Sequence, residues 1–175
     1  ESLPHFYEVL DKEVVGFNPE SSGYRLPTEA EWAWAARTDG SGNQLKYSWG
    51  DTIPPVENSG NFADISAQSY LGQIMFDYND GYLATAPVAS FDANQYELYD
   101  MSGNVSEWVH DFYGAVGAVG GVEVDPQGPT EGQFHTIRGS SWAHGSVTEL
   151  RLSFRDFGID VRDDVGFRIA RYLEE

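Results

Sequence analysis

The sequence predicts an α+β domain with short twisted strands, few helices and much ordered loop. Three observations support this class. The 175 residues include 19 glycines and 8 prolines, which interrupt regular structure often. Only one segment carries a full set of helix-start signals, and short apolar runs near the C-terminus have the spacing of strands. No linker is long enough to divide the chain, so one domain over residues 1–175 is expected.

The first 23 residues mix apolar pairs with charged side chains, so one or two short strands are expected there. A helix is predicted to follow. Thr28 is placed to cap its N-terminus, and Glu31, three residues later, completes a capping box. Residues 32–37 are strong helix formers, and the polar stretch 38–43 is expected to end the helix.

The remaining elements are expected to be strands separated by long loops. Residues 44–99 show no lasting helical period and are expected to form polar loops, with one short strand at 87–91. A turn followed by a strand is expected within 97–108, and a Gly-rich loop over 113–133. Three further strands are expected: 136–142 with a glycine bend, 150–155 with period-two alternation, and 165–171.

Charge and cysteine content exclude several functions. The formal net charge of −18 repels phosphate backbones, so we expect no nucleic-acid partner. No apolar run approaches the roughly 18 residues of a membrane span. The absence of cysteine excludes disulfides, thiolate metal sites and cysteine nucleophiles.

Oxygen-rich loops are the candidate metal sites. The four histidines are not spaced as a zinc pair. The loop that starts at Asp77 is not an EF-hand, because Val88 stands where the last ligand should be a glutamate. Asp64 and Asp80, with backbone carbonyls, could still hold a hard cation, and so could residues 100–107. A pair of carboxylates for glycoside hydrolysis remains an alternative, because it depends on spatial distance.

Several motifs occur together in a fixed order. They are GYRLPTEAEW at 23–32, AAR at 35–37, YSWG at 47–50, APV at 86–88, LYDMSGNVSEW at 98–108, RGSSW at 138–142 and GFR at 166–168. Their order and spacing resemble the formylglycine-generating enzyme (sulfatase-modifying factor) family. The resemblance runs from about Tyr24 to Arg171, and the N-terminal part of the usual family domain is expected to be missing before Glu1.

The resemblance implies a variant of the C-type lectin fold and two structural calcium sites. Asp64 and Asp100 stand where some members have Asn, which also offers oxygen. The first implied site uses the side chains of Asp64 and Asp80 and the carbonyls of Ile65 and Tyr82. The second implied site uses Asp100, Gly103, Val105 and Glu107.

The resemblance also locates the copper site of the catalytic members, which oxidise a substrate cysteine to formylglycine. In those members two cysteines shortly after the Gly-Ser-Trp strand hold the copper. Here His144 lies close to the first cysteine position and Glu149 near the second, a poor donor set for soft Cu(I). Ser106 stands where many members have Trp. No copper and no formylglycine-generating oxidase activity are therefore expected.

The function expected from these residues is that of a non-catalytic, calcium-stabilised binding or structural module. It would present a groove to a peptide, a protein or another ligand, in an extracytoplasmic setting. The groove candidates are Ser106, Trp142, His144, Arg151, Arg155 and Phe157.

Three alternatives stay open. In one, residues 142–168 are diversified, as in retroelement-diversified binders that share this fold. In another, the chain is a cysteine-free accessory domain of an oxidoreductase, of the sulfoxide-synthase type or in pigment or siderophore maturation. In the last, it is a structural part of a larger extracytoplasmic assembly.

Overall fold

The computed structural model describes residues 3–115 and 123–173. The predicted α+β class with few helices is confirmed, since one α-helix and one short 3-10 helix accompany the strands within these ranges. Part of the loop predicted over 113–133, residues 116–122, lies outside the described residues. The elements are β1 (Tyr7–Leu10), β2 (Glu13–Phe17), α1 (Glu29–Arg37), η1 (Ile65–Ala67), β3 (Ser106–Phe112), β4 (His135–Arg138), β5 (Arg155–Gly158) and β6 (Val165–Phe167).

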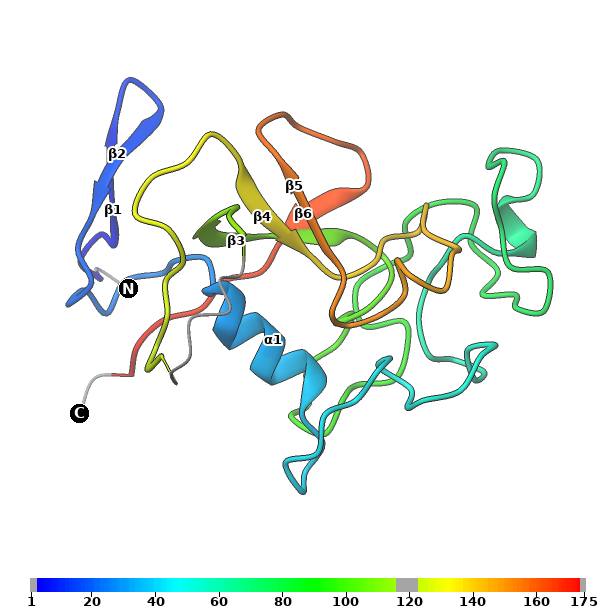
Figure 1. The fold of residues 1–175 in the computed structure, drawn as a ribbon. Coiled ribbons are helices and arrows are strands. Elements are labelled where there is room, and N and C mark those ends of the chain that lie inside the picture. Colours follow the sequence, from blue (N-terminus) through cyan, green and yellow to red (C-terminus); the bar gives the residue numbers. More distant parts are fainter. Residues whose placement is uncertain (1–2, 116–122, 174–175) are drawn as a thin grey trace.

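A four-stranded sheet in the order β5-β4-β3-β6 forms the centre of the molecule (Figure 1). The pairs β3–β4 and β4–β5 are antiparallel, whereas β6 runs parallel to β3. Successive residues of a strand face opposite sides of a sheet. On β3, Val109 is fully buried in the core beside α1, while Trp108 and His110 are only partly buried and face the other side.

Helix α1 begins as the sequence predicts. The Thr28 Oγ1 accepts a hydrogen bond from the Glu31 N–H at 3.2 Å, and a Glu31 carboxylate oxygen accepts one from the Thr28 N–H at 2.7 Å. The helix packs on β3 and β4 and buries Trp32 almost completely. In the described part of the chain no helix is long and apolar enough to cross a membrane.

Strands β1 and β2 form a separate antiparallel hairpin beside the sheet (Figure 1). Asp11 and Lys12 at its tip both have positive φ, as a two-residue turn between twisted strands requires. An aromatic cluster connects the hairpin to the sheet. Phe17 packs edge-on against His110 of β3 at 4.8 Å between ring centroids, and Phe6 stacks on Phe17.

Two apolar clusters hold the loops in place. One joins Trp32, Met101, Val109 and Leu152 between α1 and the sheet. The other lies inside the loop-rich part of the chain. Its buried members are Tyr47, Phe62, Tyr78 and Leu150.

Two strand predictions are wrong. Residues 150–155 are mostly turn, and the strand begins only at Arg155. Leu150 and Leu152 are both buried, but they lie in a turn. The turn places Leu150 in the cluster with Tyr47 and Leu152 in the cluster beside α1. Residues 87–91 are a turn in which Ala89 has a positive φ, a backbone angle that strands do not adopt.

Candidate functional site

The loop after β4 is where the family resemblance led us to expect the position of the copper site. Trp142 is nearly buried there. Its backbone N–H donates to the Asn104 carbonyl at 2.8 Å, and its indole N–H reaches the Asp163 carbonyl at 3.5 Å. The ring also lies 5.9 Å from that of Tyr70. Trp142 therefore connects this loop to three other loops.

The His144 ring is already hydrogen-bonded within the same loop. Its Nδ1 accepts a hydrogen bond from the Ser141 N–H at 3.1 Å, so the proton of a neutral ring lies on Nε2. Its carbonyl accepts a bond from the Ala63 N–H at 3.0 Å, and its ring packs edge-on against Phe154.

Glu149 closes the turn that follows. A Glu149 carboxylate oxygen accepts a hydrogen bond from the Ser146 N–H at 3.1 Å, and the Ser146 hydroxyl accepts one from the Glu149 N–H at 3.3 Å. Copper(I) prefers thiolate or similarly soft ligands. An imidazole and a carboxylate that already stabilise their own turns do not fit this ion.

The other four groove candidates lie in different environments. Ser106 is buried and donates to the Gly139 carbonyl at 3.0 Å. Arg155 forms an ion pair with Glu29 at 2.6 Å, whereas Arg151 is exposed. Phe157 is 44% exposed and packs on Tyr113 and Phe134. Of these side chains, Arg151 and Phe157 are open to a partner.

The first carboxylate pair is brought together by the loops around η1. Asp64 is fully buried and caps η1 through the Ser66 N–H at 2.7 Å, and its other oxygen accepts the Asp80 N–H. The Asp80 carboxylate accepts the N–H groups of Phe62 and Tyr82, each at 2.8 Å. Burial, with the nearby Asp64 carboxylate, raises the pKa of Asp80 to about 6.

The two carboxylates lie close together, and backbone N–H groups donate to both of them. None of the ion pairs found between described residues includes Asp64 or Asp80. Within residues 3–115 and 123–173, no three His, Cys, Asp or Glu side chains form a group that could hold a metal ion. A calcium ion here would therefore need backbone carbonyls as ligands, such as those of Ile65 and Tyr82.

The residues of the second implied calcium site already have other partners. Glu107 is buried, and its carboxylate accepts hydrogen bonds from the Trp32 indole and from Arg168, each at 2.6 Å. The Arg168 guanidinium also donates to the Asp100 carbonyl at 3.3 Å, and the Asp100 carboxylate accepts the Ala89 N–H at 2.9 Å. The positive charge of Arg168 already neutralises Glu107, which leaves this set less negative than the Asp64–Asp80 pair.

Two arginine networks were not predicted as such from the sequence. Arg168, the last residue of the GFR motif, pairs with Glu107 across the parallel strands. Arg138 reaches the carbonyls of Leu152 and Phe154 at 2.8 and 2.6 Å, and it lies 3.5 Å from Glu29. The presence of arginine in two motifs that end strands was the available signal.

Comparison with known proteins identifies a matching family. The sulfatase-modifying factor enzyme 1-like domain matches residues 6–173. The formylglycine-generating enzyme of Streptomyces coelicolor is 35% identical over 159 residues, which cover 85% of this chain and 47% of that enzyme. This chain therefore spans less than half the length of that enzyme.

Two solved structures are similar in fold. Treponema denticola variable protein 1 superimposes with a TM-score of 0.71 at 30% identity, over 89% of this chain and 50% of that one. PvdO from Pseudomonas aeruginosa gives a TM-score of 0.61 at 27% identity, over 86% of this chain and 53% of that one.

Proposed function

Because the chain belongs to the sulfatase-modifying factor enzyme 1-like domain family, which includes enzymes and non-catalytic members, we propose that it is a non-catalytic member. It is a calcium-stabilised binding or structural module with a lectin-type groove. One observation carries the proposal: His144 and Glu149, which lie near the cysteine positions expected from the family resemblance, are hydrogen-bonded into turns, and neither is a thiolate.

The absence of copper-dependent oxidase activity is tested by adding copper to the purified protein. The protein is loaded with Cu(I) and incubated aerobically with a cysteine-containing peptide, and the peptide is analysed by mass spectrometry. No aldehyde forms, and Cu(I) is held no more tightly than by a competing chelator. The double variant His144→Cys, Glu149→Cys is the matched control, and it gains Cu(I) affinity. Conversion of the peptide by the natural sequence contradicts the proposal.

Structural calcium is proposed at the first carboxylate pair. Calcium would join Asp64 and Asp80, cancel their repulsion and connect the segments on both sides of η1. At about 100-fold excess over its Kd, a ligand adds about 2.7 kcal/mol of stability. For a chain of this size this corresponds to a rise in Tm of about 5 °C or more.

Thermal melts with calcium, with magnesium and with a chelator, at equal ionic strength, measure this effect. The rise with calcium is lost in Asp80→Asn and kept in Asp160→Asn, which changes an exposed aspartate elsewhere. Equal melts with calcium and with chelator contradict the calcium site. A fold that depends on calcium suits an extracytoplasmic compartment, where calcium is millimolar, and we propose that location.

The groove is proposed to bind an extended peptide or protein segment next to the loop after β4. Arg151 and Phe157 are the open candidates for its rim. A peptide-display selection on the calcium-loaded protein is expected to enrich sequences whose binding falls at least about tenfold in Phe157→Ala or Arg151→Ala. Enriched peptides that bind both variants unchanged would exclude this rim.

A further inference from the structure

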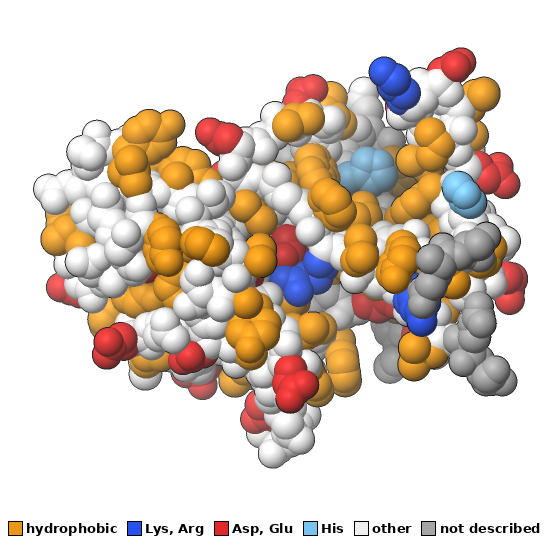
Figure 2. Space-filling model, turned by 180° about the vertical axis from the view of Figure 1, so that it is seen from behind, with side chains coloured by type: hydrophobic (Ala, Val, Ile, Leu, Met, Phe, Trp, Pro, Cys, Tyr) orange, Lys and Arg blue, Asp and Glu red, His pale blue; other side chains and the backbone are white. Residues whose placement is uncertain are grey.

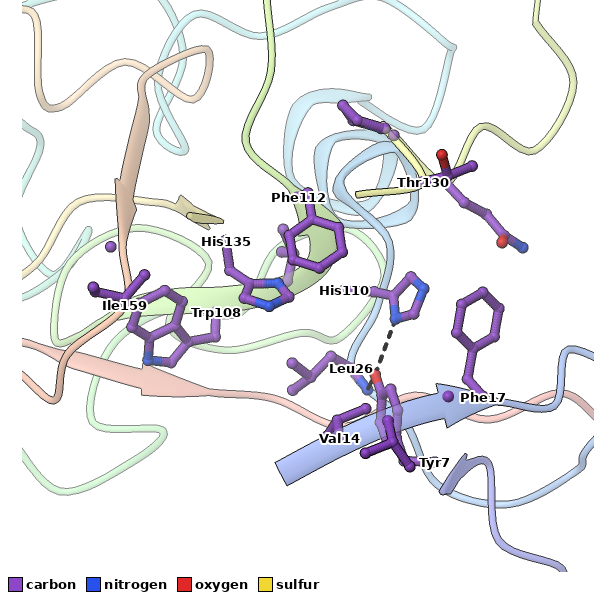
Figure 3. A pocket seen from close by; sticks show the side chains of 17 residues that line it. Tyr7, Val14, Phe17, Leu26, Trp108, His110, Phe112, Thr130, His135 and Ile159 are labelled. Atoms are coloured by element: carbon purple, nitrogen blue, oxygen red, sulfur yellow. Dashed lines mark hydrogen bonds between the residues drawn. The ribbon is translucent and has the colours of Figure 1, made fainter. Parts of the chain in front are cut away.

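The outer side of the sheet holds a cavity that the proposed function does not use. It lies between the β1–β2 hairpin and strands β3 and β4, and its volume is about 570 Å³. Small-molecule sites have volumes of roughly 300 to 1,000 Å³. Figure 3 shows the side chains that line it, and none of the six groove candidates is among them.

Six aromatic side chains line this cavity. Alternation along β3 directs Trp108, His110 and Phe112 to the hairpin side of the sheet (Figure 3). His135 of β4 stacks on Phe112 with 4.4 Å between ring centroids. The hairpin closes the opposite wall with Phe17 and aliphatic side chains. Flat aromatic molecules pack well between such walls.

The same region is visible from outside. In Figure 2, on the side of the molecule where the hairpin lies, hydrophobic side chains gather next to histidine side chains. Val14 and Val15 of the hairpin line the cavity and are each 60% exposed. Exposed aliphatic side chains at the wall of a cavity lose water contact when a ligand enters, which favours binding.

One hydrogen-bond donor in the cavity can be assigned from a chain of three groups. The Leu26 N–H donates to the Tyr7 hydroxyl oxygen at 3.2 Å, and that oxygen lies 3.2 Å from His110 Nδ1; we assign the Tyr7 O–H as the donor in this second hydrogen bond. Burial lowers the pKa of His110, which keeps the ring neutral at pH 7. With Nδ1 as acceptor, the His110 proton lies on Nε2, which is then a hydrogen-bond donor.

The charge of the lining restricts the ligand further. The chain has 28 acidic residues, yet none of the 17 residues that line the cavity is Asp, Glu, Lys or Arg. A charged ligand would leave water here without meeting an opposite charge, which is costly. The surrounding negative charge of the protein adds a further cost for an anion.

We propose that this cavity binds an uncharged, planar aromatic molecule of about two fused rings whose carbonyl oxygen accepts a hydrogen bond from His110 Nε2. The rings of the ligand lie among Trp108, Phe112 and Phe17. The site acts independently of the groove and of calcium, so its failure leaves the proposed function intact.

Coumarin is the test probe, because it has two fused rings and a carbonyl oxygen. Isothermal titration of the calcium-loaded protein is expected to show one saturable site. Val14→Trp places a large ring at the exposed wall of the cavity and weakens binding at least about tenfold. Val161→Trp is the matched control, since Val161 is 99% exposed and does not line the cavity, and it leaves the affinity unchanged.

The hydrogen bond is tested separately. His110→Phe keeps an aromatic ring and removes the donor. It weakens coumarin binding about fivefold but changes the affinity for naphthalene, which has no acceptor, by less than about twofold. Thermal melts of each variant check that it is folded.

Four binding results overturn the proposal, and a fifth result comes from the oligomeric state. The binding results are the absence of saturable coumarin binding, equal affinity in Val14→Trp, equal loss of coumarin and naphthalene in His110→Phe, and tighter binding of 1-naphthoate than of coumarin. Sedimentation of the ligand-free protein measures its oligomeric state and so tests whether a second copy of the chain occupies the cavity. A dimer that dissociates in Val14→Trp would mean that a second copy fills the cavity, and the small-molecule assignment would be wrong.

Discussion

Glu107 shows how a single buried charge is accommodated. It is a residue of β3 with only 5% of its surface exposed, and its two carboxylate oxygens accept three hydrogen bonds from Trp32 and Arg168. Breaking a buried ion pair by removing one partner costs far more than removing both, because an unpaired charge stays behind.

Arg168→Ala is expected to lower the free energy of unfolding by about 3 kcal/mol or more. Urea unfolding monitored by tryptophan fluorescence measures it. The double variant Glu107→Gln, Arg168→Met removes both charges and recovers much of the loss. If the double variant is less stable than Arg168→Ala, the ion pair is not the cause.

Asp111 is a buried carboxylate next to the N-terminus of α1. It accepts the Glu29 N–H at 2.6 Å, but burial and the negative charge of Glu29 raise its pKa to about 6. The folded state therefore binds a proton more tightly than the unfolded state does. Its contribution to stability is largest below the unfolded pKa of about 4 and is lost as the pH rises through about 6.

The predicted consequence is a pH-dependent difference between the natural sequence and Asp111→Asn. Between pH 7 and pH 5 the natural protein gains about 1 kcal/mol relative to the variant, whose amide does not titrate in this range. Denaturant unfolding at both pH values measures it. A constant difference would mean that the pKa of Asp111 is not raised in the folded state.

At the scale of elements, the helix was the most predictable part. Its start is determined locally by Thr28 and Glu31. Thr28→Ala is expected to cost about 1 kcal/mol of stability, because the N–H of Glu31 loses its acceptor. Thr148→Ala, at an exposed threonine outside the helix, is the control and leaves stability nearly unchanged. Equal effects in both variants would contradict the cap.

The strands were less predictable for a physical reason. Leu150 and Leu152 alternate with polar residues, but they are buried in two separate clusters from a turn, so alternation here reflects burial without strand pairing. Positive φ at Ala89 likewise leaves no mark in the sequence.

The candidate sites also differ in how far the sequence could predict them. Asp64, Asp80, His144 and Glu149 lie between the ordered motifs, and the family resemblance alone assigned them to sites, so their roles stay predictions. The cavity could not be predicted, since it forms where two parts distant in sequence, the hairpin and the outer face of β3, come together. The alternation of Trp108, His110 and Phe112 was its only local sign.

At the scale of the whole molecule, the net charge of −18 opposes the compact state through self-repulsion. Raising NaCl from about 0.02 M to about 0.2 M shortens the range of this repulsion about threefold. The Tm is therefore expected to rise steeply over this range and then level off, as measured by calorimetry with a chelator present. A rise that begins only above about 0.5 M would indicate salting-out instead of screening.

The parallel pairing of β6 with β3 has a consequence for synthesis on the ribosome. Glu107 is translated well before Arg168, and domains fold as units while the chain emerges from its N-terminus. Until Arg168 emerges, the nascent sheet lacks both its last strand and the cation that neutralises Glu107. Ribosome-bound chains stalled before Arg168 should thus remain sensitive to protease, whereas chains stalled well after it become resistant.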